Sequence, residues 1–116
     1  MLKKCSDMES EIRERMRGGK GQVKITHIFS KNELRGKIRL LAKILLEKNC
    51  SIGFHKHENE EEIFYILKGS GQIDDNGSII NVNPGDAILT GDGKGHAVEN
   101  TGNEPLELLA TILLYD

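Results

Sequence analysis

Three of the four histidines in this 116-residue chain fall into two groups whose spacing could serve chemistry. His55 and His57 are two residues apart, so on a β-strand both side chains point to the same face. Two imidazole rings that lie close together on an inward face are unfavourable unless a third group bridges them. A divalent cation is the usual one, because neutral imidazole is a good ligand for zinc, iron, nickel and copper.

Two later positions could add donors to the same pocket. Glu62 begins the next predicted strand, after the acidic turn 58–61, and could return a carboxylate oxygen. His96 follows the glycine-rich segment 91–95, which lets the chain turn back into a barrel without steric cost. The residues therefore suggest one metal site assembled from three separate stretches of the chain.

The elements that would position these residues are predicted to be short strands. Residues 22–29 alternate with a period of two, which favours a strand. Residues 37–47 are almost continuously apolar and could form a helix on propensity alone, but the flanking Asn49 and Gly53 and the strand-like neighbours favour a strand. Seven further strands are expected at Ser51–His57, Glu62–Lys68, Gly71–Asp74, Ser78–Val82, Asp86–Leu89, His96–Asn100 and Leu106–Tyr115. Asn-, Gly- and Pro-containing turns separate several of them, as in a β-sandwich or barrel.

The N-terminal segment has a different pattern. Met8, Ile12 and Met16 recur at helical spacing, and the mixed charges between residues 9 and 17 are typical of a solvated helix face. We therefore expect a short helix over residues 6–16, ended by the glycines of segment 18–21. This predicts two parts: an N-terminal helix with a Gly-rich linker, residues 1–21, and a single barrel domain, residues 22–116.

The last predicted strand, Leu106–Tyr115, is apolar on both faces. A strand of an isolated small barrel should have one face in water. The second apolar face is therefore expected to be covered, either by the N-terminal segment or by a second subunit, and we predict a homodimer.

Composition argues against several classes of protein. The net charge of −2 gives no sign of a nucleic-acid-binding surface, and no apolar run is long enough to span a membrane. The first residues lack the apolar stretch of a signal peptide. Cys5 and Cys50 do not have the spacing of a zinc site and suggest a reducing compartment. We expect a cytoplasmic protein that binds neither nucleic acid nor membrane.

Two motifs in the chain resemble those of the cupin family. The first family motif, G-x5-H-x-H, three or four residues, then E-x6-G, is similar to His55-Lys56-His57, four residues, and the stretch from Glu62 to Gly69. The second, G-x5-P-x-G-x2-H-x3-N, is similar to the segment from Gly85 to Asn100. The chain departs from the first motif at position 49, which is Asn where the motif begins with Gly. It departs from the second motif at position 91, which is Gly where the motif has Pro.

The resemblance implies an all-β fold, the cupin double-stranded β-helix or jelly-roll barrel of RmlC-like proteins. It also implies that His55, His57, Glu62 and His96 ligate one divalent metal ion, either Fe, Mn, Ni, Cu or Zn. Glu62 is preferred to Glu61 because it keeps the family's interval to Gly69 and shares strand parity with Phe64. The expected pocket wall is small and apolar: Leu40, Ala42, Phe64, Ile66, Ile88, Val98, Leu108 and Ala110.

Other polar residues receive ordinary structural interpretations. His27 is expected to be a half-buried histidine outside the site, and Lys94 an exposed loop residue. Tyr65 should face outward, and Asn100 should make a structural hydrogen bond. The acidic turn 58–61 is expected to be solvated.

The family resemblance implies many activities, and fold alone does not choose among them. Three neutral histidines and one carboxylate leave open positions on a six-coordinate metal, which is typical of a catalytic site. We predict a metal-dependent enzyme of the dioxygenase, isomerase or epimerase, or lyase type that acts on a small oxygenated or sugar-like molecule. The alternative is a non-catalytic metal-bearing module that binds or senses a small molecule.

Overall fold

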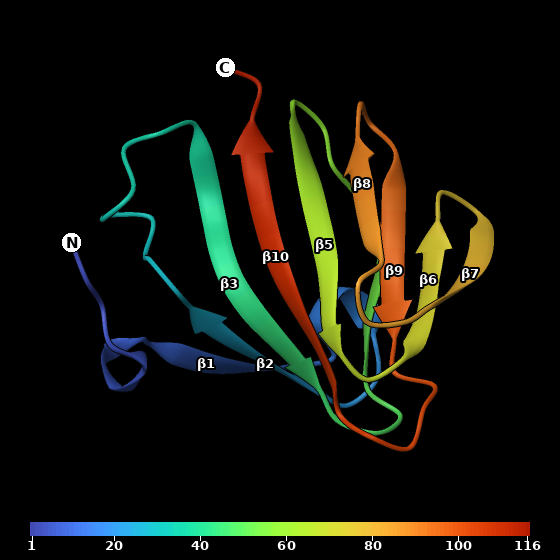
Figure 1. The fold of residues 1–116 in the computed structure, drawn as a ribbon. Coiled ribbons are helices and arrows are strands. Elements are labelled where there is room, and N and C mark those ends of the chain that lie inside the picture. The colour runs from blue at the N-terminus through green and yellow to red at the C-terminus, as the bar shows by residue number, and fades with distance from the viewer.

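The computed structural model describes residues 1–116 as ten β-strands and two short 3-10 turns (Figure 1). The 3-10 turns are η1, Cys5–Asp7, and η2, Met16–Gly18. The strands are β1 Ser10–Glu14, β2 Gln22–His27, β3 Ile38–Leu46, β4 Ser51–Lys56, β5 Glu60–Lys68, β6 Gly71–Asp75, β7 Ser78–Val82, β8 Ala87–Gly91, β9 Gly95–Glu99 and β10 Leu106–Leu114.

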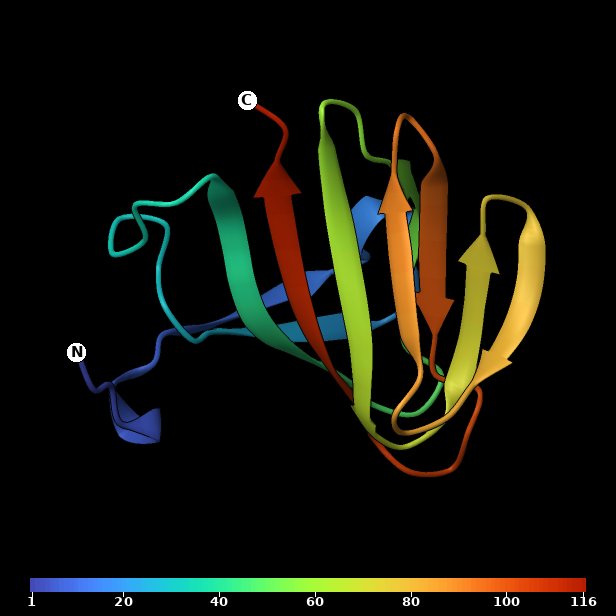
Figure 2. The same cartoon turned by 45° about the horizontal axis from the view of Figure 1, so that its top comes forward.

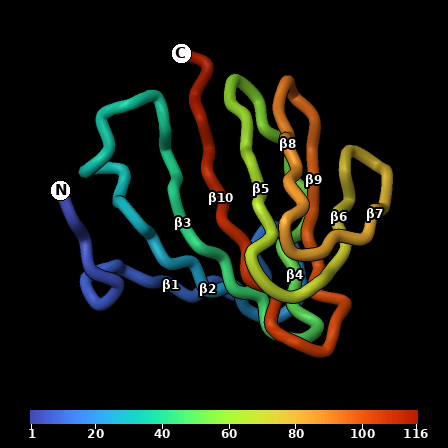
Figure 3. The backbone as a smooth tube through the Cα atoms, in the orientation of Figure 1, coloured from blue at the N-terminus to red at the C-terminus, as the bar shows by residue number.

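The strands form two antiparallel sheets that face each other. The larger has the order β1-β2-β3-β10-β5-β8, and the smaller has the order β4-β9-β6-β7. Figures 1 and 2 show the layer of β3, β10, β5 and β8 in front of β9 and β4, with the N-terminal residues far from β7. Figure 3 follows the backbone from β9 through the loop 100–105 into β10, between β3 and β5. The predicted all-β jelly-roll fold is confirmed.

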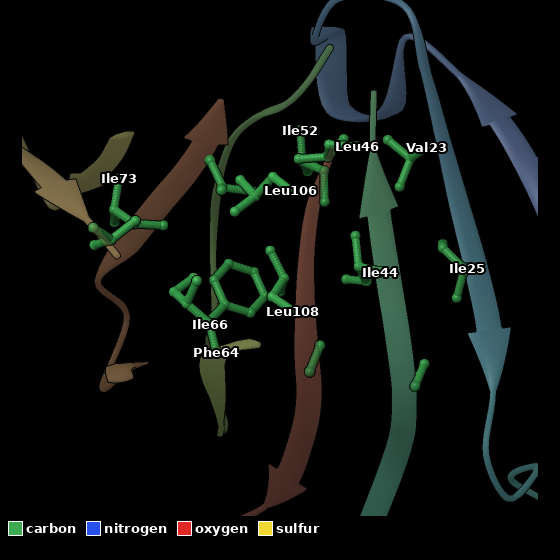
Figure 4. Packing of buried hydrophobic residues seen from close by; sticks show 14 residues of the cluster. Val23, Ile25, Ile44, Leu46, Ile52, Phe64, Ile66, Ile73, Leu106 and Leu108 are labelled. Atoms are coloured by element: carbon green, nitrogen blue, oxygen red, sulfur yellow. The ribbon is translucent and has the colours of Figure 1, made fainter. Parts of the chain in front are cut away.

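The core lies between the two sheets and follows the period-two pattern of the strands. On β10, alternate residues from Leu106 to Ile112 are buried, while those between them are half-buried. Figure 4 shows side chains from both sheets meeting in this layer, with Phe64 and Ile66 at its centre. Full burial of one such side chain contributes about 1.5–3 kcal/mol, so this layer is the main source of the barrel's stability.

The apolar segment 37–47 is strand β3, as expected from its context. It pairs with β10 along most of its length and with β2 on its other side. Because both of its edges are hydrogen-bonded, its backbone polar groups are satisfied inside the sheet, which permits a long apolar run.

The predicted helix over residues 6–16 is wrong. Only the end of η1 and the first residue of η2 are helical there, and residues 10–14 form β1, which pairs with β2 from Ser10 opposite Thr26 to Glu14 opposite Gln22. Ile12, in the middle of the expected apolar stripe, is 62% exposed. Ile12 has no surface to bury against, so the backbone hydrogen bonds offered by the free edge of β2 decide the conformation of residues 10–14. The division at residue 21 stays a prediction, and β1 lies in the same sheet as the barrel strands.

No helix in the structure is both long and apolar enough to cross a membrane. The cytoplasmic location stays a prediction.

The outer face of the larger sheet carries neighbouring apolar side chains. Leu109 of β10 lies opposite Tyr65 of β5, and Ile63 lies opposite Leu89 of β8. Tyr65 and Leu89 are 43% and 62% exposed, so Tyr65 faces outward as expected. An exposed apolar patch of this kind is typical of a surface that meets another protein. The homodimer stays a prediction, with this face as its candidate interface.

We expect light scattering to give a dimer mass for the wild type and a monomer mass for Leu89→Lys, since a buried charge without a partner is costly. Ile79→Lys is the matched control, because Ile79 is equally exposed but lies on β7 of the other sheet. A monomer mass for the wild type at micromolar concentration would exclude the dimer.

Candidate metal centre

Four side chains from three segments converge in the barrel. His55 lies on β4 and His57 directly after it, Glu62 lies on β5, and His96 lies on β9. One ligand atom from each side chain lies within 4.8 Å of the others. The His96 Nε2 atom is 3.1 Å from His57 Nε2, 3.2 Å from His55 Nε2 and 2.9 Å from Glu62 Oε1. The structure thus brings together all four residues that the sequence indicated.

The sheet pairing explains this convergence. His55 and His96 are direct cross-strand partners of β4 and β9, after an irregularity in the register that begins at Ile52. Glu62 comes from the opposite sheet, between Ile112 of β10 and Thr90 of β8. Since the two sheets face each other, both present these side chains to the same enclosed space.

The hydrogen bonds on the far side of two imidazoles fix the direction of their lone pairs. His55 Nδ1 is 2.8 Å from the Gly53 carbonyl oxygen, which can only accept, so Nδ1–H is the donor. His57 Nδ1 in the same way donates to Glu60 Oε2 at 2.5 Å. In their neutral forms, both rings therefore direct an Nε2 lone pair toward the other ligand atoms. Lone pairs and a carboxylate at this distance repel one another, and a cation among them removes the repulsion. The donor set therefore fits one metal ion.

Burial and charge act together on the ligands. Burial favours the neutral form of Glu62, but the hydrogen bonds that His55, His57 and His96 donate when their Nε2 atoms are protonated outweigh it, so the pKa of Glu62 is lowered and its carboxylate is ionised. Burial lowers the pKa of His96, which favours the neutral, metal-binding form. For His57 burial acts in the same direction, but the Glu62 and Glu60 carboxylates outweigh it and raise the pKa.

His96 is held by packing rather than by a hydrogen bond on its second nitrogen. Its ring stacks on Phe64, with centroids 4.5 Å apart and planes 7° from parallel. Its Nδ1 atom is buried and has no hydrogen-bond partner. The flat contact with Phe64 therefore orients the ring, whereas His55 and His57 are oriented by acceptors.

Glu60 forms an outer layer of the site that the sequence did not indicate. It accepts from His57 and also from Arg39, whose Nε and Nη2 lie 2.7 and 2.8 Å from its two oxygens. Mainly because of Arg39, the pKa of Glu60 is lowered to about 2. The expectation of a solvated acidic turn is therefore wrong for this residue, although Glu58 is exposed.

A bulge in β3 brings Arg39 into the site. Ile112 and Leu113 of β10 are adjacent, but they pair with Leu40 and Ile38, so Arg39 is an extra residue without a partner. A bulge redirects the side chain of the extra residue. The alternation of residues along a predicted strand assumes regular pairing and gives no sign of a bulge. The sequence therefore did not indicate Arg39.

A cavity of about 100 Å³ is lined by three of the four candidate ligands, His55, His57 and Glu62. Leu40 and Phe64 line it as expected, but Ala42, Ile66, Val98, Leu108 and Ala110 belong to the core instead, and Ile88 packs against that core. The expected apolar wall is therefore wrong in part. Arg13, Arg17, Arg39 and His27 also line the cavity, so three guanidinium groups stand among the apolar residues of its border.

The remaining polar residues mostly follow the sequence interpretation. His27 lies outside the ligand cluster, is half-buried, and is 2.7 Å from Glu11. Asn100 is fully buried, and its Nδ2 donates to the carbonyl oxygens of Leu46 and Glu104. Lys94 is exposed.

Comparisons with known proteins agree with this geometry. The family described as "Cupin domain" matches residues 43–112. A protein of Thermotoga maritima named oxalate-binding protein is 45% identical over 114 residues, 98% of this chain and 94% of that protein. An uncharacterized protein of Methanocaldococcus jannaschii is 33% identical over 85 residues, 73% of this chain and 68% of that protein. A crystal structure of a predicted oxalate decarboxylase from Thermotoga maritima superimposes with a TM-score of 0.93 at 45% identity, covering 98% of this chain and 99% of that one.

Replacing Glu60 by Gln should weaken metal binding about 10- to 100-fold, the usual effect of losing a carboxylate that orients a ligating histidine. Competition with a fluorescent chelator measures the affinity. Glu61→Gln is the matched control, since Glu61 has no ion pair in the structure and is the neighbouring acid. Equal affinities for both variants would show that Glu60 does not support the site.

The lowered pKa of Glu60 also predicts a pH dependence of stability in the metal-free protein. Its carboxylate stabilises the fold above its unfolded-state pKa of about 4.5, and this contribution is lost as the pH falls toward 2. Wild type should exceed Glu60→Gln in free energy of unfolding by on the order of 2 kcal/mol near neutral pH. Urea denaturation at several pH values should show this difference shrinking in acid. A difference that does not change with pH would contradict the assignment.

Proposed function

The chain belongs to the cupin family, and on that premise we propose that it binds one divalent metal ion through His55, His57, Glu62 and His96 and holds a small carboxylate ligand beside that ion. The observation that carries the proposal is the convergence of three Nε2 atoms and one carboxylate oxygen in a buried space. Such a group of donors is costly to bury without a cation.

The donor set suits a transition metal. Three neutral imidazoles and one carboxylate are compatible with Fe, Mn, Ni, Cu or Zn. With a divalent ion these ligands leave a net charge of +1, and positions beyond the four protein ligands are available to a small molecule. The ion would supply a Lewis acid beside the cavity.

The cavity supports a small anionic ligand. Arginines border it, and its volume is about 100 Å³. A cavity of about 150 Å³ accommodates benzene, so this one takes a ligand of about that size or smaller. Oxalate fits these limits and is the ligand in the name of the relative that is 45% identical to this chain.

Turnover of the lyase type is the second candidate. Decarboxylation of oxalate breaks its carbon–carbon bond, releases carbon dioxide, and adds one proton to give formate. His27 is the only titratable side chain of the cavity apart from the arginines and the metal cluster, so it is the candidate proton donor. Without turnover, the same site is a binding or sensor module.

Protein purified without chelator or metal-affinity resin should contain about one metal ion per chain by elemental analysis, and His96→Ala should lose it. His27→Gln is the control that keeps the metal, because His27 is the histidine outside the cluster. Wild-type protein that stays empty after dialysis against several transition metals would refute the metal site. Calorimetry should then show that oxalate binds the metal-loaded protein and does not bind the metal-free protein.

Assay of formate and carbon dioxide from oxalate separates the two candidate functions. Production by wild type that is lost in His27→Gln, with oxalate binding retained, supports the lyase. Binding without products supports the module.

A further inference from the structure

The three arginines at the cavity differ in whether their charge is already neutralised. Arg39 makes a two-pronged pair with Glu60. Arg13 Nε donates to Glu11 at 2.6 Å, and Glu11 also binds His27. Arg17 has neither an ion pair nor a side-chain hydrogen bond, although it lines the same cavity. It is therefore the uncompensated guanidinium beside the metal cluster.

The backbone that carries Arg17 has an uncommon conformation. Arg15 and Arg17 both have positive φ, 49° and 55°, a region that residues other than glycine seldom occupy. Such a conformation persists where the surroundings enforce it. Here the Arg15 N–H donates to the Gly21 carbonyl oxygen at 2.8 Å, and the Gly18 and Gly19 N–H groups donate back into the turn.

This turn is fastened to the strand that carries His55. Ser51 of β4 and Lys20 exchange two hydrogen bonds, 2.8 and 2.9 Å long. At Gly53 a Cβ atom would collide with the carbonyl oxygen of Arg17, so the two backbones touch there. The carbonyl oxygen of Gly53 in turn accepts from His55 Nδ1. One short stretch of β4 thus fixes both the arginine segment and a metal ligand.

The charges around the cavity indicate the charge that a bound ligand should carry. The Arg39–Glu60 and Arg13–Glu11 pairs each sum to zero. A divalent ion on the three histidines and Glu62 leaves one positive charge, and Arg17 supplies a second. A ligand of charge −2 would neutralise both, whereas a monoanion would leave one unpaired.

We propose that Arg17 is a specificity-determining residue that binds one carboxylate of a small dicarboxylate dianion whose other carboxylate lies at the metal centre. This inference rests on the proposed function and deepens it by naming the ligand class and the residue that selects it. Guanidinium presents paired N–H donors that match a carboxylate, and the charge-assisted contact favours a dianion over a monoanion of similar size. The selecting residue lies outside the segment 43–112 that the cupin family matches.

The experiment uses metal-loaded full-length protein and isothermal titration with oxalate, with glyoxylate as a monoanion of similar size, and with sulfate as an inorganic dianion. Arg17→Gln should bind oxalate about tenfold or more weakly, with a smaller change for glyoxylate. Arg17→Lys should recover part of the loss. Arg15→Gln is the matched control, because Arg15 shares the turn and the positive φ but does not line the cavity.

Metal content of every variant by elemental analysis separates failure of this inference from failure of the proposed function. Arg17→Gln that keeps both its metal and wild-type oxalate affinity would overturn the role of Arg17, as would equal losses in Arg17→Gln and Arg15→Gln. Sulfate bound more tightly than oxalate would overturn the dicarboxylate class. Wild-type protein that binds no metal, or no oxalate when loaded, would overturn the proposed function and this inference together.

Discussion

The site depends on one electrostatic constraint: three imidazole nitrogens and one carboxylate oxygen point at each other inside a barrel. The Nε2 atoms of His57 and His96 are only 3.1 Å apart, with Glu62 beside both, so wherever these nitrogens carry lone pairs they repel one another and the carboxylate. A cation turns this mutual repulsion into attraction, and the low polarity of the surrounding core strengthens the effect. The fold therefore holds together a set of donors whose natural complement is a metal ion.

The residues around these ligands restrict their freedom in two ways. Carbonyl and carboxylate acceptors orient His55 and His57, while Phe64 orients His96 by stacking. Two N–H groups of Arg39 on β3 donate to the Glu60 carboxylate on β5. Arg39 therefore helps to hold Glu60 in the position where it orients the His57 ring. Such support reduces the reorganisation that metal binding requires.

The N-terminal residues close the cavity beside the metal cluster and give it charge. Met16 and Arg17 line this cavity, and the tight contact between Gly53 and Arg17 keeps the turn on β4. The two cupin motifs therefore supply the donors for a metal, whereas residues near the N-terminus add part of the wall and two of the three arginines, Arg13 and Arg17, to the space in which a ligand would lie.

The sequence by itself determined the strand pattern and the four candidate ligands. Period-two alternation and turn residues are local signals, and His55, His57, Glu62 and His96 lie at intervals typical of a known family. Only the tertiary structure decided the rest. Of the stripe of Met8, Ile12 and Met16, only Ile12 lies in the edge strand β1, because β2 offered hydrogen bonds and no surface offered burial to Ile12. The roles of Arg39 and Arg17 depend on a bulge and on backbone packing between distant segments, and neither leaves a periodic trace in the sequence.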